Sequence, residues 1–438
     1  MEKMASPDFP VHPESPIHPE FIVQQLGPCE VPSPLRLGDT FVSDEVRIPL
    51  HAEIHNGSVP DPGCSFERAG PRRKIYFHPA DVRAAAVTCG GLCPGLNNVV
   101  RSLVLQLHYG YGVKECLGIR YGYRGLDPDT GMPPLYLTPA LVSDIHEHGG
   151  SILGTSRGNP EPAVMVRRLR ELGVNMLFVI GGDGTQQGAH QIWLEASRQG
   201  DPMAVVGIPK TIDNDIPYVW RTFGYATAVE KARQVIDSAH NEARAHFNGV
   251  GLVKLMGRDA GFIAAGATLA SQEVNFTLVP EVPFRLRGEG GFLETLLERL
   301  QQRRHAVVVV AEGAGMDLFP EPHDPKQRPD IGLFLMQEIR SYFRERKVPV
   351  DVKYLDPSYY IRGATANTDD AFLCDQLARN AVHAAMAGKT GMLIGIWYNM
   401  MTHVPVSLCT GEKKRLTESS EIWQSVLRAT GQPVRFGC

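Results

Sequence analysis

The chain of 438 residues has no apolar run that approaches the roughly 20 residues needed to cross a bilayer, and its longest apolar stretches are strand-sized. It also has no surplus of basic residues, because 44 lysines and arginines stand against 48 aspartates and glutamates, for a formal net charge of -4. The first absence argues against an integral membrane protein. The second argues against a nucleic-acid partner that is bound through its charge.

Cysteine is scarce and lacks the spacing of a metal site or a disulfide framework. Among eight cysteines, the closest pair is Cys89 and Cys93, and no second pair has matching spacing, which favours reduced thiols. The proline-rich, acidic start fits neither a secretory signal nor an arginine-rich transit peptide, and the last four residues do not look like a peroxisomal signal. We therefore expect a cytoplasmic protein.

Residues 1–80 differ from the remainder of the chain. Their prolines and histidines are scattered without periodicity, apart from residues 21–26 and a possible edge strand near 46–50. This pattern predicts an extended, partly ordered arm that wraps a neighbouring domain or subunit, with disorder as the alternative. A second segment dense in proline and charge, 321–330, is predicted to be a surface loop.

From residue 84 onward, short apolar strands alternate with amphipathic or capped helices, which indicates crossover units and mainly parallel sheets. The predicted strands cover residues 84–87, 176–180, 203–208, 250–255, 305–311 and 392–397. The predicted helices cover residues 97–107, 161–172, 185–198, 225–245, 259–271, 292–303, 331–346 and 368–387. Because one sheet rarely holds so many elements, we expect two packed, Rossmann-like, three-layer α/β domains with the active site in the cleft between them.

A glycine-rich turn with one carboxylate, GGDGT at 181–185, follows the predicted strand at 176–180. Glycines at the carboxyl end of a strand let backbone N–H groups approach an anion. Asp183 could hold Mg²⁺ beside a phosphate chain, while Gly184 leaves space for nucleotide phosphates. A helix N-cap is the alternative role for Asp183.

A second glycine-rich turn, residues 88–97, leads from the strand at 84–87 into a helix. The same reasoning favours an anion site, and a tight turn without a ligand is the alternative. The spacing matches neither the G-x-G-x-x-G fingerprint nor a Walker A loop.

Two carboxylates follow the strand at 203–208, in the sequence PKTIDND at 209–215. If the backbone is extended there, Asp213 and Asp215 point the same way and can share a proton, a cation or a substrate hydroxyl. A carboxylate that takes a proton from a sugar hydroxyl is what phosphoryl transfer to an alcohol requires, and Lys210 offers a positive charge to the transferred group. A calcium site or an ordinary surface turn is the alternative.

Further charged side chains lie close to predicted strand ends. Arg258 follows the strand at 250–255, and Glu312 follows the strand at 305–311. Lys353, Tyr359 and Arg362 add two cations and a phenol. Each could be a salt bridge or a helix cap, but together they suggest a second anion pocket, suited to a sugar phosphate.

Taken together, these segments resemble the phosphofructokinases over roughly residues 84–400. The resemblance rests on GGxxPGxN at 90–97, GGDGT at 181–185, PKTIDND at 209–215, the turn at 223–224 and KLMGRDAGFIA at 254–264. GGDGT alone also occurs in NAD kinases and diacylglycerol kinases, whereas the TIDND and MGR segments in this order do not. The long arm and the Tyr-Tyr-Ile-Arg segment look most like the long-chain subgroup of plants, trypanosomes and some bacteria.

This resemblance implies transfer of a phosphoryl group from ATP to the C1 hydroxyl of fructose 6-phosphate, a step of glycolysis. Asp213 would be the general base, Thr211 would hold the substrate, and Asp215 would orient the site or the metal. Asp183 would ligate Mg²⁺. Lys210 and Arg157 would stabilise the charge that develops on the transferred group.

The resemblance also implies a set of contacts and a division into domains. The donor would contact Gly91, Arg157, Gly158, Gly182, Asp183, Gly184 and Thr185. The sugar phosphate would contact Thr211, Ile212, Asp213, Met256, Gly257, Arg258, Glu312, Lys353, Tyr359, Tyr360, Ile361 and Arg362. Residues 81–224 and 363–402 would form the donor-binding domain, residues 225–362 the sugar-phosphate domain, and residues 403–438 a C-terminal extension.

The phosphoryl donor is the least settled part of this interpretation. In the resembled family, glycine at the position of Gly184 is typical of ATP users, whereas lysine at the position of Lys210 is usual in pyrophosphate users and also occurs in the long-chain ATP subgroup. A pyrophosphate-dependent enzyme, a non-catalytic regulatory subunit and a lipid or NAD kinase are the alternatives. The family also implies a homo-oligomer, with a tetramer as the first expectation, although residues 245–249 lack the intersubunit arginine of the short bacterial members.

Overall fold

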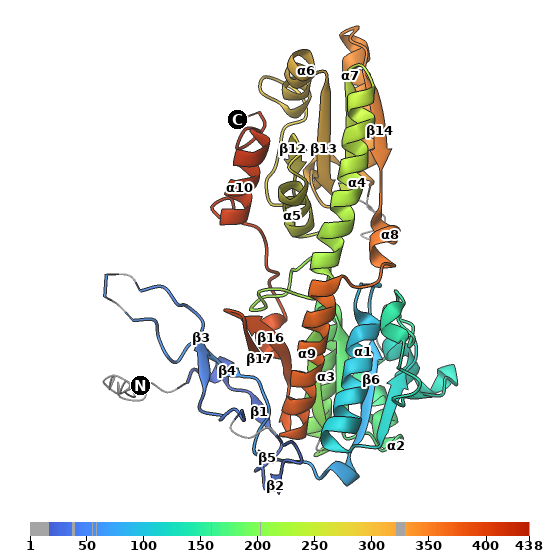
Figure 1. The fold of residues 1–438 in the computed structure, drawn as a ribbon, viewed down its shortest axis with the longest axis vertical. Coiled ribbons are helices and arrows are strands. Elements are labelled where there is room, and N and C mark those ends of the chain that lie inside the picture. Colours follow the sequence, from blue (N-terminus) through green and yellow to red (C-terminus); the bar gives the residue numbers. More distant parts are fainter. Residues whose placement is uncertain are drawn as a thin grey trace, which may run out of the picture.

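Two β-sheets with helices on both faces organise the chain into two lobes, which are stacked along the long axis of the molecule (Figure 1). The computed structural model describes residues 17–36, 40–54, 56–57, 59–158, 160–201, 203–320 and 329–437. Each lobe is a three-layer α/β unit with a mainly parallel sheet, so the predicted fold class is confirmed. Of the predicted surface loop at 321–330, residues 321–328 lie outside the described part of the chain.

The first lobe contains a nine-stranded sheet whose five central strands, β16, β10, β9, β6 and β7, are parallel. In spatial order the strands are β3 (Arg47–Pro49), β4 (Ser65–Arg68), β17 (Met400–Pro405), β16 (Met392–Trp397), β10 (Ala204–Pro209), β9 (Met176–Gly181), β6 (Arg83–Thr88), β7 (Glu115–Ile119) and β8 (Leu135–Tyr136). Every residue of β9 and β10 is buried. Strands covered on both faces need apolar side chains on both, which explains their unbroken apolar sequences.

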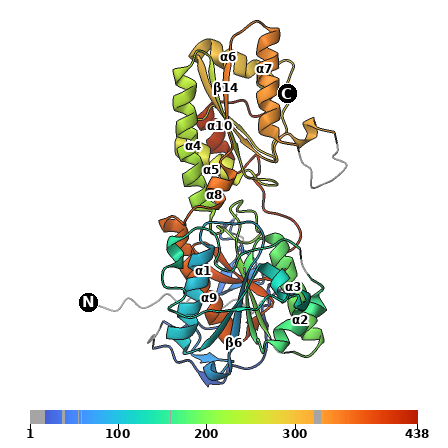
Figure 2. The same cartoon turned by 90° about the vertical axis from the view of Figure 1, so that its right-hand side faces the viewer.

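Helices cover both faces of this sheet (Figure 2). One face is covered by α1 (Leu96–Leu105) and α9 (Thr368–Met386), and the other by α2 (Pro162–Glu171) and α3 (Asp183–Arg198). Because β6, β9 and β10 are neighbouring parallel strands, the loops that follow them meet at one edge of the sheet. This is the edge at which open α/β sheets bind ligands.

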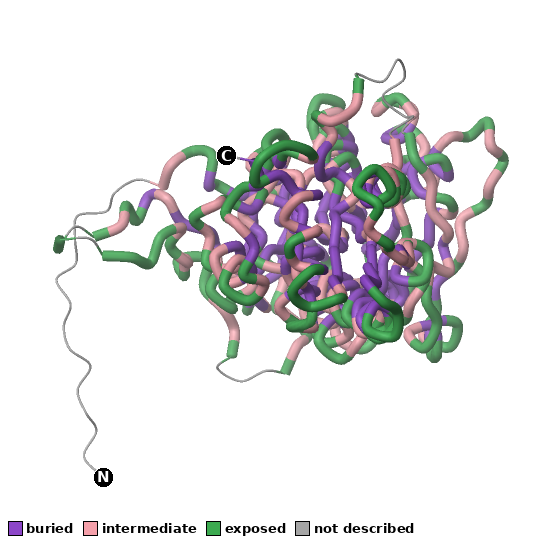
Figure 3. Tube along the Cα trace, turned by 90° about the horizontal axis from the view of Figure 1, so that it is seen from above, coloured by how far each residue is buried: buried purple, intermediate pink, exposed green. Residues whose placement is uncertain are grey.

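The second lobe is smaller and its sheet is entirely parallel. Its strands, in spatial order, are β12 (Phe276–Leu278), β13 (His305–Ala311), β11 (Gly249–Leu255) and β14 (Asp351–Leu355). Its helices are α4 (Tyr225–Ala245) and α5 (Phe262–Ser271) on one face, and α6 (Phe292–Arg303) and α7 (Ile331–Glu345) on the other. Buried residues fill the interior of both lobes (Figure 3).

The C-terminal residues do not form a separate extension. The expected boundary between residues 402 and 403 falls inside β17, which pairs with β16 on one side and β4 on the other. Beyond β17 the chain crosses to the second lobe, where α10 (Glu421–Thr430) packs against α5 with Trp423 buried (Figure 1). The helix α8 (Ser358–Arg362) lies between β14 and α9.

The described part of the N-terminal arm wraps the first lobe of its own chain. The predicted edge strand is present as β3, which is the first strand of the sheet and pairs with β4, and β4 in turn pairs with β17. The pairing of β1 (Gln24–Gln25) with β15 (Lys389–Thr390) fastens the arm to the lobe, and β2 (Val31–Pro32) pairs with β5 (Lys74–Ile75) within the arm itself. None of the described helices is both long enough and apolar enough to span a membrane.

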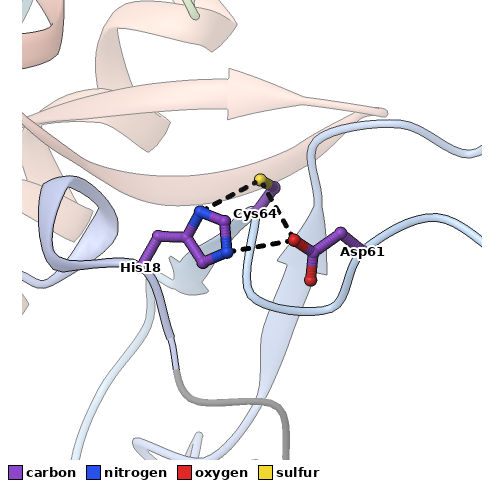
Figure 4. A group of neighbouring side chains, drawn as sticks. All are labelled: His18, Asp61 and Cys64. Carbon is purple, nitrogen blue, oxygen red and sulfur yellow. Dashed lines mark hydrogen bonds and ion pairs between the residues drawn. The ribbon is translucent and has the colours of Figure 1, made fainter.

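A small polar cluster ties the beginning of the described arm to the turn before β4 (Figure 4). His18 Nε2 lies 3.0 Å from Asp61 Oδ2, and the Cys64 thiol lies 3.7 Å from His18 Nδ1. The backbone N–H of His18 also donates to the carbonyl of Gly63. The three side chains satisfy one another by hydrogen bonding, and they fix the path of the arm at the sheet edge.

Buried charge holds the arm more firmly. Glu67 on β4 accepts from Arg72 at 2.8 Å, from Lys389 at 3.1 Å and from His403 on β17 at 3.0 Å, and all four side chains are buried. Burial acts to raise the pKa of Glu67, but the hydrogen bond from His403 and the charges of Lys389 and Arg72 outweigh it and hold that pKa well below its usual range. The arm is therefore joined to the sheet by an ionic network.

Removing the Glu67 charge should destabilise the protein strongly. Glu67→Gln leaves Arg72 and Lys389 buried with the half-exposed carboxylate of Asp44 as their remaining counter-ion, and breaking a buried ion pair typically costs about 3–5 kcal/mol of unfolding free energy. Urea denaturation at pH 7 measures this loss, with Glu45→Gln, an exposed glutamate of the same arm, as the matched control. Because the pKa of Glu67 is depressed in the folded state, its contribution is complete above the unfolded pKa of about 4.3 and is lost as the pH falls further, so the two proteins should converge in acid.

Candidate active site

A cavity of about 570 Å³ lies where the loops after β6, β9 and β10 meet, at the junction of the two lobes. It is lined by Cys89, Gly90, Gly91, Leu92, Cys93, Ser156, Arg157, Gly158, Gly182, Asp183, Gly184, Thr185, Gln187, Lys210, Thr211, Ile212, Asp213, Asp215, Arg362 and Lys413. All the predicted donor residues therefore share one cavity with the TIDND carboxylates. Cys89 and Cys93, which flank its first loop, are buried free thiols.

The loop after β6 has the shape of an anion cradle. Gly90 and Gly95 have φ of 85° and 99°, values that favour glycine, and a Cβ on Gly95 would lie 2.6 Å from the Cys374 sulfur. The buried Lys210 donates from Nζ to the Gly91 carbonyl oxygen at 2.7 Å. Burial lowers the pKa of Lys210, so a bound anion would gain a poorly hydrated cation.

The turn after β9 offers backbone and one carboxylate. Asp183 is the first residue of α3, after the N-cap Gly182, and its Oδ1 accepts from Gln187 Nε2 at 3.1 Å. The carboxylate thus stands at the positive end of the α3 dipole and lines the cavity. A Cβ built on Gly184 would meet no atom within 4 Å, so the cavity is open in front of this residue.

The loop after β10 differs from the extended conformation considered above. Asn214 has φ of 54°, which breaks the alternation of side chains, so Asp213 and Asp215 have different surroundings. Asp215 Oδ1 accepts from Thr211 Oγ1 at 3.0 Å, and its Oδ2 accepts from Lys413 Nζ at 2.9 Å. Both oxygens of Asp215 are therefore engaged, and the two carboxylates do not act as an equivalent pair.

Asp213 has a free oxygen. Its Oδ1 is buried and has no hydrogen-bond partner among the described residues. Burial raises the pKa of Asp213 to about 7, and the negative charges of Asp215 and Glu312 act in the same direction, against the cations of Arg362 and Lys413. A carboxylate with an unengaged oxygen and a pKa near neutrality is suited to accept a proton from a bound hydroxyl.

The residues expected to bind the sugar phosphate divide into groups. Thr211, Ile212, Asp213 and Arg362 line the main cavity. Arg258 lines a neighbouring cavity of about 440 Å³.

Three further expected residues, Met256, Gly257 and Glu312, follow the neighbouring strands β11 and β13 of the second lobe and line neither of these two cavities. Met256 is buried, and Gly257 has φ of 126° with only 2.6 Å between its potential Cβ and the Ala260 carbonyl. Glu312 donates its backbone N–H to the Leu255 carbonyl at the end of β11. It lies near enough to Asp213 to raise the pKa of that carboxyl.

The remaining expected residues line neither the main cavity nor the neighbouring one. The side chain of Ile361 is buried in the core, whereas Tyr359 is 87% exposed. Tyr360 borders a shallow groove beside α4. Lys353 lies within β14, and its Nζ is 3.2 Å from Asp351 Oδ2.

Sequence reasoning missed Lys413, Ser156 and Gln187. Lys413 stands in the basic run at 413–415, whose sequence is typical of a solvated surface. Only the three-dimensional path of the chain brings it to Asp215. Ser156 and Gln187 carry no motif of their own, although they neighbour Arg157 and the GGDGT turn.

Comparison with known proteins places this site in a family. Residues 83–385 match the family model described as Phosphofructokinase. The chain is 42% identical to the ATP-dependent 6-phosphofructokinase of Borreliella burgdorferi over 95% of its own length and 97% of the relative's. It is 45% identical to ATP-dependent 6-phosphofructokinase 7 of Arabidopsis thaliana over 91% of its own length and 82% of the relative's.

A solved structure has the same fold at low sequence identity. The pyrophosphate-dependent phosphofructokinase of Nitrosospira multiformis superposes with a TM-score of 0.66 at 18% identity, over 82% of this chain and 93% of that one. The motifs after β6, β9, β10 and β11 and the family match lead to the same conclusion. The chain belongs to the phosphofructokinase family.

Proposed function

We propose that this protein transfers the terminal phosphoryl group of ATP to the C1 hydroxyl of fructose 6-phosphate, giving fructose 1,6-bisphosphate and ADP. The observation that carries the proposal is the free, buried oxygen of Asp213 in the cavity that also contains the glycine-rich turns. The names of the curated relatives support ATP as the donor.

Asp213 is the general base of this reaction. Its free oxygen accepts the C1 hydroxyl proton as the sugar oxygen forms its bond to the γ-phosphorus and the bond to the leaving ADP oxygen breaks. Thr211 Oγ1 accepts the backbone N–H of Asp213 at 3.1 Å while it donates to Asp215, so the base is held on a fixed loop. Asp215, engaged at both oxygens, does not compete for the proton.

Positive charge and backbone N–H groups hold the donor. Lys210, Arg157 and the first turn of α3 surround the cavity in which negative charge develops during transfer. The Asp183 carboxylate, an oxygen donor beside the phosphate-binding turn, is the group that fits Mg²⁺. When bound, Mg²⁺ would neutralise phosphate charge.

The sugar phosphate requires both lobes. Arg362 supplies a cation in the main cavity, and Arg258 and Glu312 contribute from the strand ends of the second lobe. Lys353, Tyr359 and Tyr360 lie outside these cavities in a single chain. We include in the proposal a homo-oligomer, with a tetramer as the first expectation, which rests on the family resemblance, and a cytoplasmic location, which rests on the cysteine pattern described above.

The reaction is tested by measuring fructose 1,6-bisphosphate formed from fructose 6-phosphate and Mg²⁺, with ATP and pyrophosphate supplied in parallel. Turnover with ATP alone is the expected result. Turnover with pyrophosphate alone would reverse the donor assignment. A folded protein that uses neither donor would contradict the proposed function and favour a regulatory subunit.

Gly184 provides a test of donor selectivity. The open space before it suits the rest of a nucleotide, and a carboxylate there would oppose the donor phosphates, so Gly184→Asp should lower kcat/KM for ATP on the order of 10²-fold. The matched control is Gly184→Ala, whose methyl group meets no atom within 4 Å, and it should cause a much smaller loss. Equal losses in the two variants would show that bulk and not charge limits this position.

Asp213→Asn should lower kcat on the order of 10² to 10⁴, with little change in the binding of either substrate. Steady-state kinetics and equilibrium binding measure the two effects. In the unmodified protein kcat/KM should fall below about pH 7, because the base must be deprotonated. The raised pKa also means that the charged form of Asp213 costs stability above its unfolded pKa, so the variant should melt no lower than the parent at pH 8.

A further inference from the structure

The segment between β17 and α10 crosses from one lobe to the other beside the active site (Figure 1). It is fastened on both sides of the crossing. The backbone N–H of Lys414 donates to the Asp215 carbonyl at 3.0 Å in the first lobe. The backbone N–H of Leu416 donates to Glu281 Oε1 at 2.9 Å in the second lobe, and the same Glu281 carboxylate accepts from the backbone N–H of Gly261 near the start of α5.

Lys413 immediately precedes the first of these two attachments and bridges the lobes through its ammonium group. Its Nζ is 2.9 Å from Asp215 Oδ2, on the loop after β10, and 3.0 Å from Asp259 Oδ2, on the loop after β11. Asp215 is 7% exposed, and Lys413 and Asp259 are each little more than one-quarter exposed, so the pair is not a solvated surface contact. Burial acts to lower the pKa of Lys413, but the two carboxylates outweigh it and raise that pKa to about 12, so the group is charged at neutral pH.

We propose that Lys413 is a positioning residue of the phosphoryl transfer, which fixes Asp215 away from the base Asp213 and holds the Arg258–Asp259 loop of the second lobe against the first. The proposal rests on the proposed function of the cavity. It gives the crossing segment a role in the reaction, whereas sequence analysis treated residues 403–438 as an extension.

Lys413 keeps the carboxylates of Asp213 and Asp215 in different surroundings. Thr211 engages one oxygen of Asp215 and Lys413 engages the other. Without Lys413, one oxygen of Asp215, two residues from the base, would be buried without its hydrogen-bond partner. The carboxylate would then rotate toward another donor, and the Thr211 hydroxyl that supports the Asp213 backbone would lose its fixed acceptor.

Lys413 also contributes to the charge around the base Asp213. Asp213 faces the carboxylates of Asp215 and Glu312 and the cations of Arg362, Lys413 and Lys210. Loss of Lys413 removes one of these cations. The proton affinity of the base should therefore rise, and the base would be protonated over more of the working pH range.

Lys413 also connects one loop of each lobe, through Asp215 and Asp259. Asp259 directly follows Arg258, which borders the neighbouring cavity, and Asp215 belongs to the loop that carries the base. One ammonium group therefore sets the separation between a loop of the phosphoryl-donor side and a loop of the sugar-phosphate side. A misplacement of about 1 Å between reacting groups can cost on the order of 10² in rate.

The test compares Lys413→Met with the unmodified full-length enzyme in the ATP-dependent assay. We expect kcat to fall on the order of 10²-fold, KM for ATP to change much less, and the acidic limb of kcat/KM to move to higher pH. Lys413→Arg keeps the charge and should recover a large part of kcat. Methylammonium or ethylammonium added to Lys413→Ala should restore activity in a saturable manner, which loss of folding alone would not allow.

Lys414→Met is the matched control, because Lys414 belongs to the same segment but donates to the backbone carbonyls of Val219 and Trp220. Because burial lowers the pKa of Lys414 to about 7 and Asp215 lies within electrostatic range of it, this control is read from rescue alone: alkylammonium ions should not activate Lys414→Met. The inference is overturned if Lys413→Met keeps kcat within twofold, or if it loses activity with no pH shift, no recovery in Lys413→Arg and no rescue of Lys413→Ala.

These outcomes are separate from failure of the proposed function. If the unmodified enzyme turns over fructose 6-phosphate with ATP, every result above bears on Lys413 alone. If the unmodified enzyme is inactive with both donors, the proposed function fails first and Lys413 has no reaction to support.

Discussion

The active site depends on keeping one carboxylate buried and only partly compensated. Asp213 is withdrawn from water, and no described residue hydrogen-bonds its Oδ1, an arrangement that is costly for a charged group. The cost is limited by Arg362 and Lys413 nearby, and the negative charges of Asp215 and Glu312 keep the pKa of Asp213 near neutrality. Full pairing of Asp213 would stabilise the loop but leave no oxygen for a substrate proton. Asp215, on the same loop, differs from Asp213 because both of its oxygens are hydrogen-bonded, which leaves it no free oxygen for a substrate proton.

The sheet topology makes this arrangement possible. Parallel strands that lie side by side end at the same edge, so the loops after β6, β9 and β10 converge although they are separated by long stretches of sequence. Each loop contributes what its own sequence allows: glycines at positive φ after β6, a helix start with one carboxylate after β9, and the proposed base after β10. In the second lobe β11 and β13 are likewise parallel neighbours, and Arg258 and Gly313, which follow them, line the neighbouring cavity.

Much of this could be predicted from the sequence, because strands buried on both faces are continuous apolar runs. The predicted strand at 305–311 and the predicted helices at 225–245 and 292–303 have the observed bounds. The strands β7, β12, β14 and β17 were missed, since they are short, polar or at the edge of a sheet, and their pairing comes from tertiary contacts. The motif loops were located correctly. The positive φ of Asn214 and the partners of the two Asp215 oxygens could not be predicted, because the backbone torsion of a single loop residue depends on tertiary contacts. Lys413 was missed because its two partners are distant in the chain.

Those distant contacts explain how the described part of the arm and the segment after β17 are built into the fold. The arm strand β4 pairs with β17, and Glu67 bonds His403 and Lys389 on either side of β16, so buried charge fixes the edge of the first sheet. The segment that carries Lys413 leaves directly from that edge, and α10 anchors it on α5. Lys413 Nζ reaches two carboxylates at 2.9 and 3.0 Å because the chain on either side of this residue is attached to a different lobe. The pairing of β17 and the ionic network of the arm hold the chain on the first lobe, and α10 with its buried Trp423 packs against α5 on the second, so contacts far from the cavity flank the residue that engages Asp215.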